Sequence, residues 1–391
     1  MMKQRQKVGA TICVVCSMTN SKVLIQNIYY MLAYAFKVLR QSNYSNVATE
    51  DFENIHNLLA AILSKGISQQ LKQGLYREYI DNSDDLNVLR GKLNIAGTIK
   101  SQIQHKRVLS CEYDELSEDN IFNQILKLTA TILIKNCNVD AEYKSELKKL
   151  MLFFTGVSDI TVSNIMWSTL WFQRNNQSYK MLMNICYLVI DGLLLSTQDG
   201  EYSMADFIDD QHMHSLYESF IREYYRYHYG NEVSVSASFV DWDVPEGSEG
   251  IELLPKMKTD ITLQKGDKTL IVDAKYYSRT MQHHFDSNTF HSANMYQIYT
   301  YVKNFDKNHT GNVSGMLLYA RTDEAIQPDN EYMIGGNKIG IKTLDLNCDF
   351  KLIAAQLDAI AEQFFGVHEL RNEMEIRYDG NHYSTPTTLF P

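Results

Sequence analysis

Two runs of alternating apolar and polar residues, separated by Gly266-Asp267, constrain the fold of this chain more than any other feature. Glycine followed by aspartate suits a tight hairpin turn, and strict alternation is typical of strands that bury one face. We therefore predict an antiparallel hairpin over 257–277. If Gly266 and Asp267 form its turn, the register places Asp260 directly opposite Asp273.

This register brings three charged side chains to one face of the predicted hairpin. Opposed residues have Cβ atoms about 5 Å apart, and Lys275 shares the face because it lies two residues beyond Asp273. Opposed carboxylates repel each other unless a cation lies between them, and Mg²⁺ prefers oxygen ligands. A lysine beside such a metal can hold the attacking water or stabilise charge on a phosphate. The hairpin therefore predicts a metal-dependent site for phosphodiester hydrolysis at Asp260, Asp273 and Lys275.

The alternative for these residues is an exposed hairpin whose aspartates face water. Short charge patterns recur by chance, so the local pattern alone leaves both interpretations open. The neighbouring Ile271 and Val272 favour a buried strand, where a pair of charges needs a reason.

The predicted organisation has two halves. The first half shows mainly helical spacing, with strand candidates at 76–80 and 108–113, and we predict one mostly helical domain over 21–197. Helices flanking a small mixed sheet predict an α/β domain over 198–375, so the chain as a whole is expected to be α+β. In the second half, the predicted elements outside the hairpin are strands over 233–240 and 313–319 and helices over 211–229, 292–304 and 350–363. Residues 1–20 are predicted to be a disordered extension, and residues 376–391 a flexible tail.

The composition limits what the chain can do alone. It carries 37 basic and 47 acidic residues, a net charge of −10, whereas proteins that find DNA unaided usually present a basic surface. If this chain acts on DNA, we expect a partner to deliver it. No stretch approaches the ~20 apolar residues of a membrane span, and the apolar run near the N-terminus is at the lower limit for a signal peptide. We expect a cytoplasmic protein with reduced thiols, in which the single CxxC pair, Cys13 and Cys16, binds no zinc.

Three further patterns suggest functions that we do not adopt. The segment GGNKIGIKT (335–343) is one inserted residue away from a P-loop, and its flanks look like strands, so we predict no nucleotide site. His283, His284 and His291 fall in a polar stretch that we predict to be a surface loop. Trp167 and Trp171, four residues apart, are predicted to belong to a helical core.

The strand bearing Asp260, followed by a strand that ends in Asp273-Ala274-Lys275, resembles the PD-(D/E)xK nuclease superfamily. The resemblance implies that the two aspartates and the main-chain carbonyl of Ala274 bind Mg²⁺. Gln297 and Tyr301 lie four residues apart on one helical face and are similar to the QxxxY element of several such nucleases. Glu218 resembles an upstream acidic position that sometimes binds the metal. Its alternative is an ion pair with Arg222 at i+4.

A larger set of sequence blocks resembles the McrC family of modification-dependent restriction systems. The blocks occur in the family's order over roughly residues 24–365: NIYYMLAYAF (27–36), LRGKL (89–93), CEYDELSEDNIFNQILK (111–127), LLPKMKTDI (253–261), IVDAKYY (271–277) and FHSANMYQ (290–297). The resemblance implies an endonuclease subunit whose first domain docks on McrB, a ring-forming AAA+ GTPase, and which stimulates the GTP hydrolysis of that partner. The partner would bind GTP, recognise modified cytosine and translocate the DNA. Self-association that bridges two rings is also implied.

Two other functions remain as alternatives. The chain could be a non-catalytic regulator of an AAA+ ring, although the intact Asp260, Asp273 and Lys275 argue against a degenerate nuclease. It could also be a PD-(D/E)xK nuclease of another defence or repair system, which the blocks of the first half disfavour.

Overall fold

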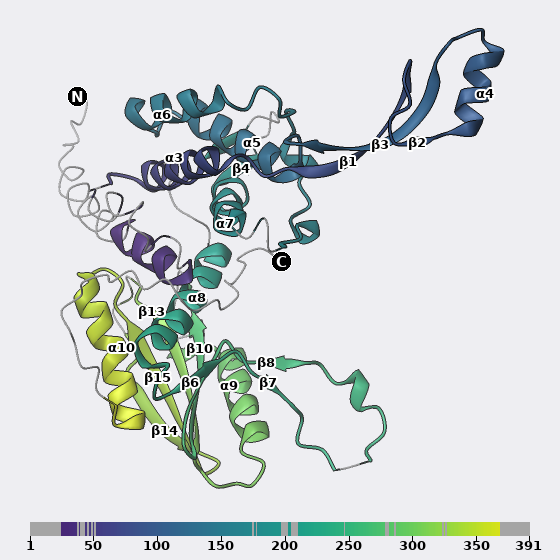
Figure 1. The fold of residues 1–391 in the computed structure, drawn as a ribbon. Coiled ribbons are helices and arrows are strands. Elements are labelled where there is room, and N and C mark those ends of the chain that lie inside the picture. The colour runs from purple at the N-terminus through teal and green to yellow at the C-terminus, as the bar shows by residue number, and fades with distance from the viewer. Residues whose placement is uncertain are drawn as a thin grey trace, which may run out of the picture. The chain divides into compact units, whose positions relative to one another are not determined.

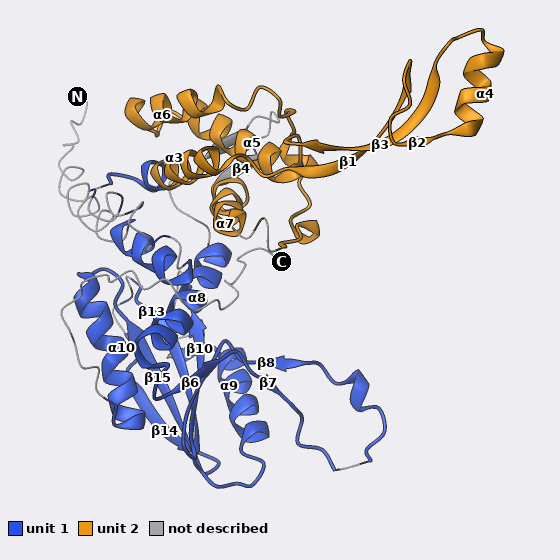
Figure 2. Cartoon of the chain, in the orientation of Figure 1, with its two compact units in different colours: residues 1–58, 205–389 blue, residues 59–204, 390–391 orange. Residues whose placement is uncertain are grey.

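The computed structural model divides the chain into two compact units. Unit 1 comprises residues 1–58 and 205–389, and unit 2 comprises residues 59–204 and 390–391 (Figure 2). The structure describes residues 25–36, 39, 44, 47, 50, 52–173, 176, 178–196, 202–204, 210–245, 247–277, 281–284, 287–322, 324 and 327–367. The predicted extension (1–20), the predicted tail (376–391) and the Cys13-Cys16 pair lie outside these residues.

Unit 1 is built on a mixed six-stranded sheet with the order β14-β15-β13-β10-β9-β6 (Figure 1). The three central strands β10, β13 and β15 are parallel, and β9, β6 and β14 pair antiparallel with their neighbours. The predicted mixed sheet is thus confirmed. The strands are β6 (Ser234–Ser236), β9 (Ile261–Lys265), β10 (Lys268–Lys275), β13 (Val313–Ala320), β14 (Asn330–Ile334) and β15 (Asn337–Leu344).

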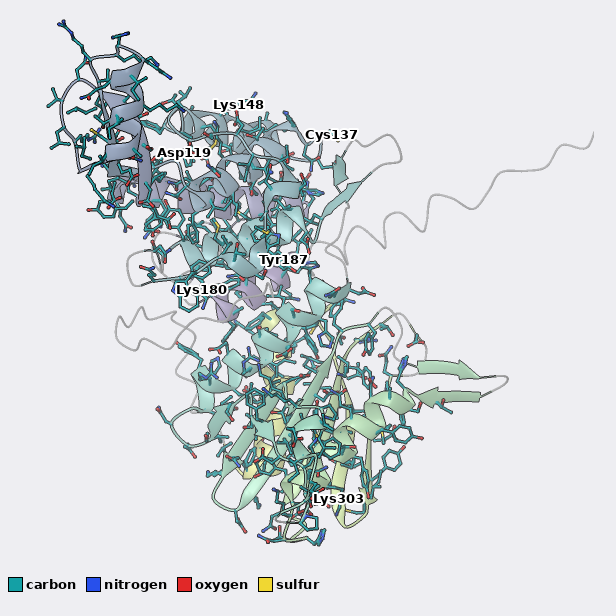
Figure 3. The ribbon with its side chains drawn as sticks, turned by 90° about the vertical axis from the view of Figure 1, so that its right-hand side faces the viewer. Asp119, Cys137, Lys148, Lys180, Tyr187 and Lys303 are labelled. Carbon is teal, nitrogen blue, oxygen red and sulfur yellow. The ribbon has the colours of Figure 1, made fainter. Side chains whose placement is uncertain are left out.

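Helices cover both faces of this sheet, so β10 and β13 are buried on both sides. On one face α9 (Ser292–Phe305) packs against odd-numbered residues such as Ile271 and Leu317. On the other face lie α8 (Asp210–Tyr229), which contacts Tyr276 through Tyr217, and α10 (Phe350–Phe365). Lys303 of α9 (Figure 3) donates to the Gly335 carbonyl at 2.9 Å and so fixes α9 to the β14–β15 turn.

The helix over 25–35 belongs to unit 1, although it begins the described chain. Asn27 donates to the carbonyls of Leu346 and Cys348 at 2.6 and 2.9 Å. Tyr34 packs on Phe220 of α8 and stacks on Phe350 of α10. The division therefore differs from the predicted single domain over 21–197. Periodicity identifies an apolar helix face but does not identify the distant element that buries it.

Two short antiparallel pairs of strands in unit 1 lie outside the six-stranded sheet. One pair is β7 (Phe239–Val240) with β8 (Met257–Lys258), and the segment between them contains the 3-10 helix η5 (Ile251–Leu253). The other is β11 (Met281–His284) with β12 (Ser287–Phe290). The backbone of His283 and His284 thus lies in a hairpin strand, and the predicted loop is wrong there because alternation in this polar segment was too weak to recognise.

Gly335 and Gly336 form the turn between β14 and β15, with φ values of 58° and 87°. Positive φ is strained for other residue types, which explains the Gly-Gly pair. A P-loop connects a strand to a helix, whereas this segment connects two antiparallel strands. The prediction that it is no nucleotide site is consistent with this topology.

Unit 2 has a helical body with an arm. Its helices are α3 (Ile55–Gln73), α4 (Ile95–Ile103), α5 (Ile121–Lys135), α6 (Ala141–Met151) and α7 (Tyr179–Ile190), with the 3-10 helices η3 (Val162–Asn164) and η4 (Trp167–Thr169) and a short pair of strands, β4 (Leu194–Ser196) and β5 (Tyr202–Met204). All residues of α7 except Lys180 are buried, which explains its continuous apolar sequence. No helix in the described part of the chain is long and apolar enough to cross a membrane.

The tryptophan prediction is wrong. Trp167 begins η4 rather than an α-helix and packs edge-on against Tyr187 of α7, the residue labelled in Figure 3. Trp171 follows without helical structure and is 76% exposed. Spacing of four residues suggested one helical face, but the intervening chain forms a short 3-10 turn.

The arm consists of β1 (Glu78–Leu86) and β3 (Leu109–Ser117), which pair antiparallel along their whole lengths and carry β2 (Lys92–Leu93) and α4 at the far end (Figure 1). Asn123 anchors its base, donating to the carbonyls of Tyr76 and Glu118 at 2.9 and 2.7 Å. The two predicted strands exist but continue well past 80 and 113. The sequence did not predict these continuations, because they consist largely of polar and acidic residues, which are uncommon in strands.

Candidate functional site

The hairpin at the centre of the site has the predicted register. Gly266 has φ 61° in the turn, and pairing runs from Lys268 opposite Lys265 to Val272 opposite Ile261. Asp260 lies one residue beyond this ladder, in a bend between β8 and β9. Its carboxylate accepts a hydrogen bond from the Ala274 amide at 3.0 Å. The two aspartates are therefore neighbours, but a side-chain contact rather than a ladder pair sets the geometry of Asp260.

Asp273 is a buried carboxylate whose negative charge is only partly compensated by its neighbours. It is 0% exposed, and neither of its oxygens accepts a hydrogen bond from the described part of the chain. Lys275 Nζ lies 2.9 Å from Oδ2, as an ion pair without hydrogen-bond geometry. A buried carboxylate without hydrogen bonds costs folding free energy unless a cation satisfies it. Lys275 supplies one positive charge for two neighbouring aspartates, so this environment favours a further cation beside Asp273.

The charges at the site shift each other's pKa values. Burial, followed by the nearby charge of Asp273, raises the pKa of Asp260 to about 7. Burial also raises the pKa of Asp273, against the opposing effect of Lys275. Burial alone would lower the pKa of Lys275, but the two aspartates outweigh it and raise that pKa overall. Lys275 therefore remains protonated, whereas the carboxylate pair is short of positive charge.

Gln297 and Tyr301 lie on α9 as a connected pair. Lys275 Nζ donates to Gln297 Oε1 at 3.4 Å, and Gln297 Nε2 donates to Tyr301 Oη at 3.0 Å. The structure thus places Gln297 beside the lysine, while Tyr301, which is buried in the core, reaches it only through Gln297. Their predicted functional role stays a prediction.

Glu218 lies on α8 and forms the ion pair with Arg222 that we weighed as its alternative, at 2.9 Å. Burial, then the negative charge of Asp260, raises the pKa of Glu218, so this carboxylate lies near the hairpin site. The ion pair is confirmed, and a role for Glu218 in metal binding stays a prediction.

Two residues near the site were missed. His214 lies one turn before Glu218, and its ring centroid is 6.3 Å from that of Tyr277; burial, then the charge of Lys275, lowers its pKa. The i, i+4 spacing of His214 and Glu218 was a usable signal. Arg222 donates to the main-chain carbonyl of Asp260 at 3.3 Å. No sequence pattern indicates that contact, because its acceptor belongs to the backbone.

The residues present fit a small divalent cation. Among the described residues, no group of three His, Cys, Asp or Glu side chains is close enough to hold a metal ion. Mg²⁺, however, is commonly bound through one or two carboxylates and completed by water and substrate phosphates. Asp260 and Asp273 supply two carboxylates. Neither oxygen of Asp273 accepts a hydrogen bond from the described part of the chain, and Oδ2 pairs only with the Lys275 ammonium there, so both oxygens can turn to a metal ion. The Ala274 N–H faces Asp260. Because the N–H and the carbonyl of a strand residue face the same side, the Ala274 carbonyl faces the side of Asp260 as well.

Comparison with known proteins identifies the family. Residues 5–320 match the family model described as "McrBC 5-methylcytosine restriction system component". The chain belongs to this family. The resemblance to McrC found in the sequence is thereby confirmed. The match to the McrBC family begins at residue 5, so it includes most of the segment that we predicted to be an extension.

The chain also resembles individual McrBC proteins. It is 30% identical over 343 residues to "Type IV methyl-directed restriction enzyme EcoKMcrBC" of Escherichia coli strain K12, covering 87% of this chain and 97% of the relative. A structure of Thermococcus gammatolerans McrB AAA+ hexamers with bound McrC matches with a TM-score of 0.49 and 19% identity, over 86% of this chain and 76% of that chain. A cryo-EM structure of the McrBC complex from the same organism matches with a TM-score of 0.40 and 21% identity, over 52% and 58%.

Proposed function

We propose that this protein is the Mg²⁺-dependent endonuclease subunit of a McrBC-like complex that cuts DNA containing modified cytosine. One observation carries the proposal: Asp260, Asp273 and Lys275 meet on one hairpin, with both aspartates raised in pKa by burial. Burying a cluster of charges lowers stability, and buried clusters with shifted pKa values are typical of functional sites. Membership of the McrBC family supplies the biological context.

The chemistry follows from the roles that these side chains can take. When bound, Mg²⁺ would polarise the scissile phosphate and lower the pKa of a bound water. Asp260 and Asp273 would hold the ion, with the Ala274 carbonyl. Lys275 is kept protonated by both aspartates, so it can pair with a phosphate oxygen on which negative charge develops. Gln297 accepts from the ammonium and limits where it can point.

The proposed fold of unit 1 is that of a PD-(D/E)xK nuclease. Support comes from its mixed sheet with helices on both faces, and from the position of the acidic residues at the ends of β9 and β10. A DNA duplex would approach the end of the sheet where Asp273 and Lys275 lie.

We propose an AAA+ GTPase similar to McrB as the partner, which binds GTP and delivers the DNA. A net charge of −10 gives this chain little attraction for phosphate. The far end of the arm offers a docking surface in unit 2, since Ile95 and Ile103 of α4 are 67% and 74% exposed. Exposed apolar side chains gathered on a projecting element are typical of an interaction site.

The proposal is tested by cleavage of methylated plasmid DNA by the full chain with a McrB-like GTPase, GTP and Mg²⁺. Asp273→Asn should abolish cleavage while leaving stimulation of GTP hydrolysis intact. Asp267→Asn is the matched control, because Asp267 is exposed in the turn of the same hairpin and accepts only from Asn312 in the described structure. Full cleavage by the Asp273 variant would contradict the proposed site, and loss of cleavage in both variants would show a general defect of the hairpin.

A further inference from the structure

Arg222 is a buried cation that reaches the hairpin site from α8. It is 7% exposed, and its guanidinium contacts Glu218 Oε1 at 2.9 Å and Ser219 Oγ at 3.5 Å. It also donates to the main-chain carbonyl of Asp260 at 3.3 Å. Burying a guanidinium is unfavourable unless its donors are satisfied, and its planar fork suits several acceptors at once. The side chain therefore connects α8 to the backbone of a proposed metal ligand.

The backbone at Asp260 needs such a connection because no strand ladder holds it. The preceding strand, β8, pairs with β7, whereas the following strand, β9, pairs with β10 and β6. Residues 259 and 260 are where the chain leaves one pair of strands and enters the sheet. Thr259 is held by Ser238, whose carbonyl accepts from the Thr259 amide at 2.9 Å. At Asp260 two contacts replace the ladder, one from Arg222 to the carbonyl and one from Ala274 to the carboxylate.

We propose that Arg222 is a positioning residue for Asp260, an inference that rests on the proposed metal site. By holding the peptide carbonyl, the guanidinium fixes the direction in which the carboxylate leaves the backbone. The carboxylate then lies between the Ala274 amide and Asp273, where a cation can bind both aspartates. Residues that orient metal ligands in this way usually contribute about 10–100-fold to metal affinity.

A second role for Arg222, neutralising Glu218, has to be separated from the first. The ion pair with Glu218 would exist whether or not Asp260 needed orientation. Removing both partners, in Arg222→Met/Glu218→Gln, keeps the local charge balanced but still deletes the contact with the Asp260 carbonyl. Because Glu218 is itself a candidate metal ligand, the double variant is compared with Glu218→Gln alone. Positioning predicts that the double variant binds the metal more weakly than Glu218→Gln, whereas pure charge balance predicts that it binds at least as tightly.

Arg226 provides a matched control on the same helix. It pairs with Glu223 at i+3 and donates to the Val235 carbonyl, with no contact to Asp260 in the described structure. Arg226→Met therefore removes a partly buried helix ion pair of the same kind without touching the site. A loss of metal affinity in this variant would indicate general loosening of α8 rather than positioning.

The experiment measures Mn²⁺ binding to the full chain by electron paramagnetic resonance, without partner or DNA, together with thermal unfolding. Asp273→Asn should lose Mn²⁺ binding; if it does not, the proposed metal site itself is wrong. Given that loss, Arg222→Lys should weaken Mn²⁺ binding about 10–100-fold relative to wild type, and the double variant about 10–100-fold relative to Glu218→Gln, each with thermal stability similar to that of Arg226→Met. An affinity in the double variant equal to that of Glu218→Gln, or an equal loss in Arg226→Met, would overturn the positioning role while leaving the metal site standing.

Discussion

Replacing Asp260 with asparagine should stabilise the metal-free protein, although the change removes a proposed metal ligand. Burial and the charge of Asp273 raise the pKa of Asp260 from 3.8 to about 7. The folded state therefore binds this proton more tightly than the unfolded state, and ionising the group opposes folding. One pKa unit corresponds to about 1.4 kcal/mol, so the full shift corresponds to about 4 kcal/mol. Because the side chain is only partly buried, solvent screening reduces this to on the order of 2–4 kcal/mol.

The stabilisation should depend on pH. Since the folded pKa is the higher one, the wild-type carboxyl is protonated in both states below about pH 4 and opposes folding increasingly up to about pH 7. Asparagine keeps an oxygen for the Ala274 amide but never ionises. The difference in the free energy of unfolding between Asp260→Asn and wild type should therefore rise from near zero at about pH 4 to its full value at about pH 8.

Urea unfolding in the presence of EDTA measures this difference. Of the 3 tryptophans, only Trp242 lies in unit 1, so a Trp167→Phe/Trp171→Phe background reports on this unit by fluorescence. Saturating Mg²⁺ should then stabilise the wild type and leave the Asp260 variant unchanged, because a ligand stabilises only the state that binds it. A variant less stable than wild type at about pH 8 in EDTA, or a difference that does not change with pH, would refute the electrostatic reasoning.

Three further outcomes are expected. Asp306 accepts hydrogen bonds from Thr310, Gly311 and Asn337, and its pKa is lowered to about 2. Asp306→Ala should therefore lower the free energy of unfolding by about 2–3 kcal/mol at neutral pH. Because the pKa in the folded state is lower than in the unfolded state, urea titrations should show this difference shrinking as pH falls from about 4 toward 2. Ile99 of α4 is 52% exposed and lies one turn before Ile103. Ile99→Ser/Ile103→Ser at the far end of the arm should reduce stimulation of the partner's GTPase without changing thermal stability, and a wild-type GTPase rate would contradict docking there. Filter binding at physiological salt should show weak binding of the isolated chain to duplex DNA with no preference for modified cytosine, and tight, selective binding would overturn the proposed division of labour.

The hairpin site was predictable because its information is local. Gly266-Asp267 fixes the turn, the turn fixes the register, and alternation then assigns Asp273 and Lys275 to one face. The departure of Asp260 from the ladder was not predictable, since it depends on a change of strand partners between β8 and β9. The contact of Arg222 with the main-chain carbonyl of Asp260 could not be predicted either, because every residue type presents the same backbone acceptor.

The larger architecture was predictable only in part. Helical and strand segments of unit 1 follow from periodicity, and the mixed sheet agrees with them. The arm was underestimated because its strands are rich in polar and acidic residues, so they show no apolar alternation. The assignment of the helix over 25–35 to unit 1 depends on partners more than 180 residues away in sequence, such as Phe220 and Phe350. Periodicity carries no information about such distances.

The interrupted chain path of unit 1 has a consequence for how the protein is made. The helix over 25–35 leaves the ribosome early, but the residues that cover its apolar face, around Phe350, are synthesised about 300 residues later. At about 5–20 residues per second, that delay is about 15–60 s. Unit 2, by contrast, is continuous through 59–204 and can form while the remainder is still being translated. Until Phe350 and its neighbours are made, the apolar face of this helix is incompletely covered, so we expect the nascent chain to need transient protection that the finished molecule does not need.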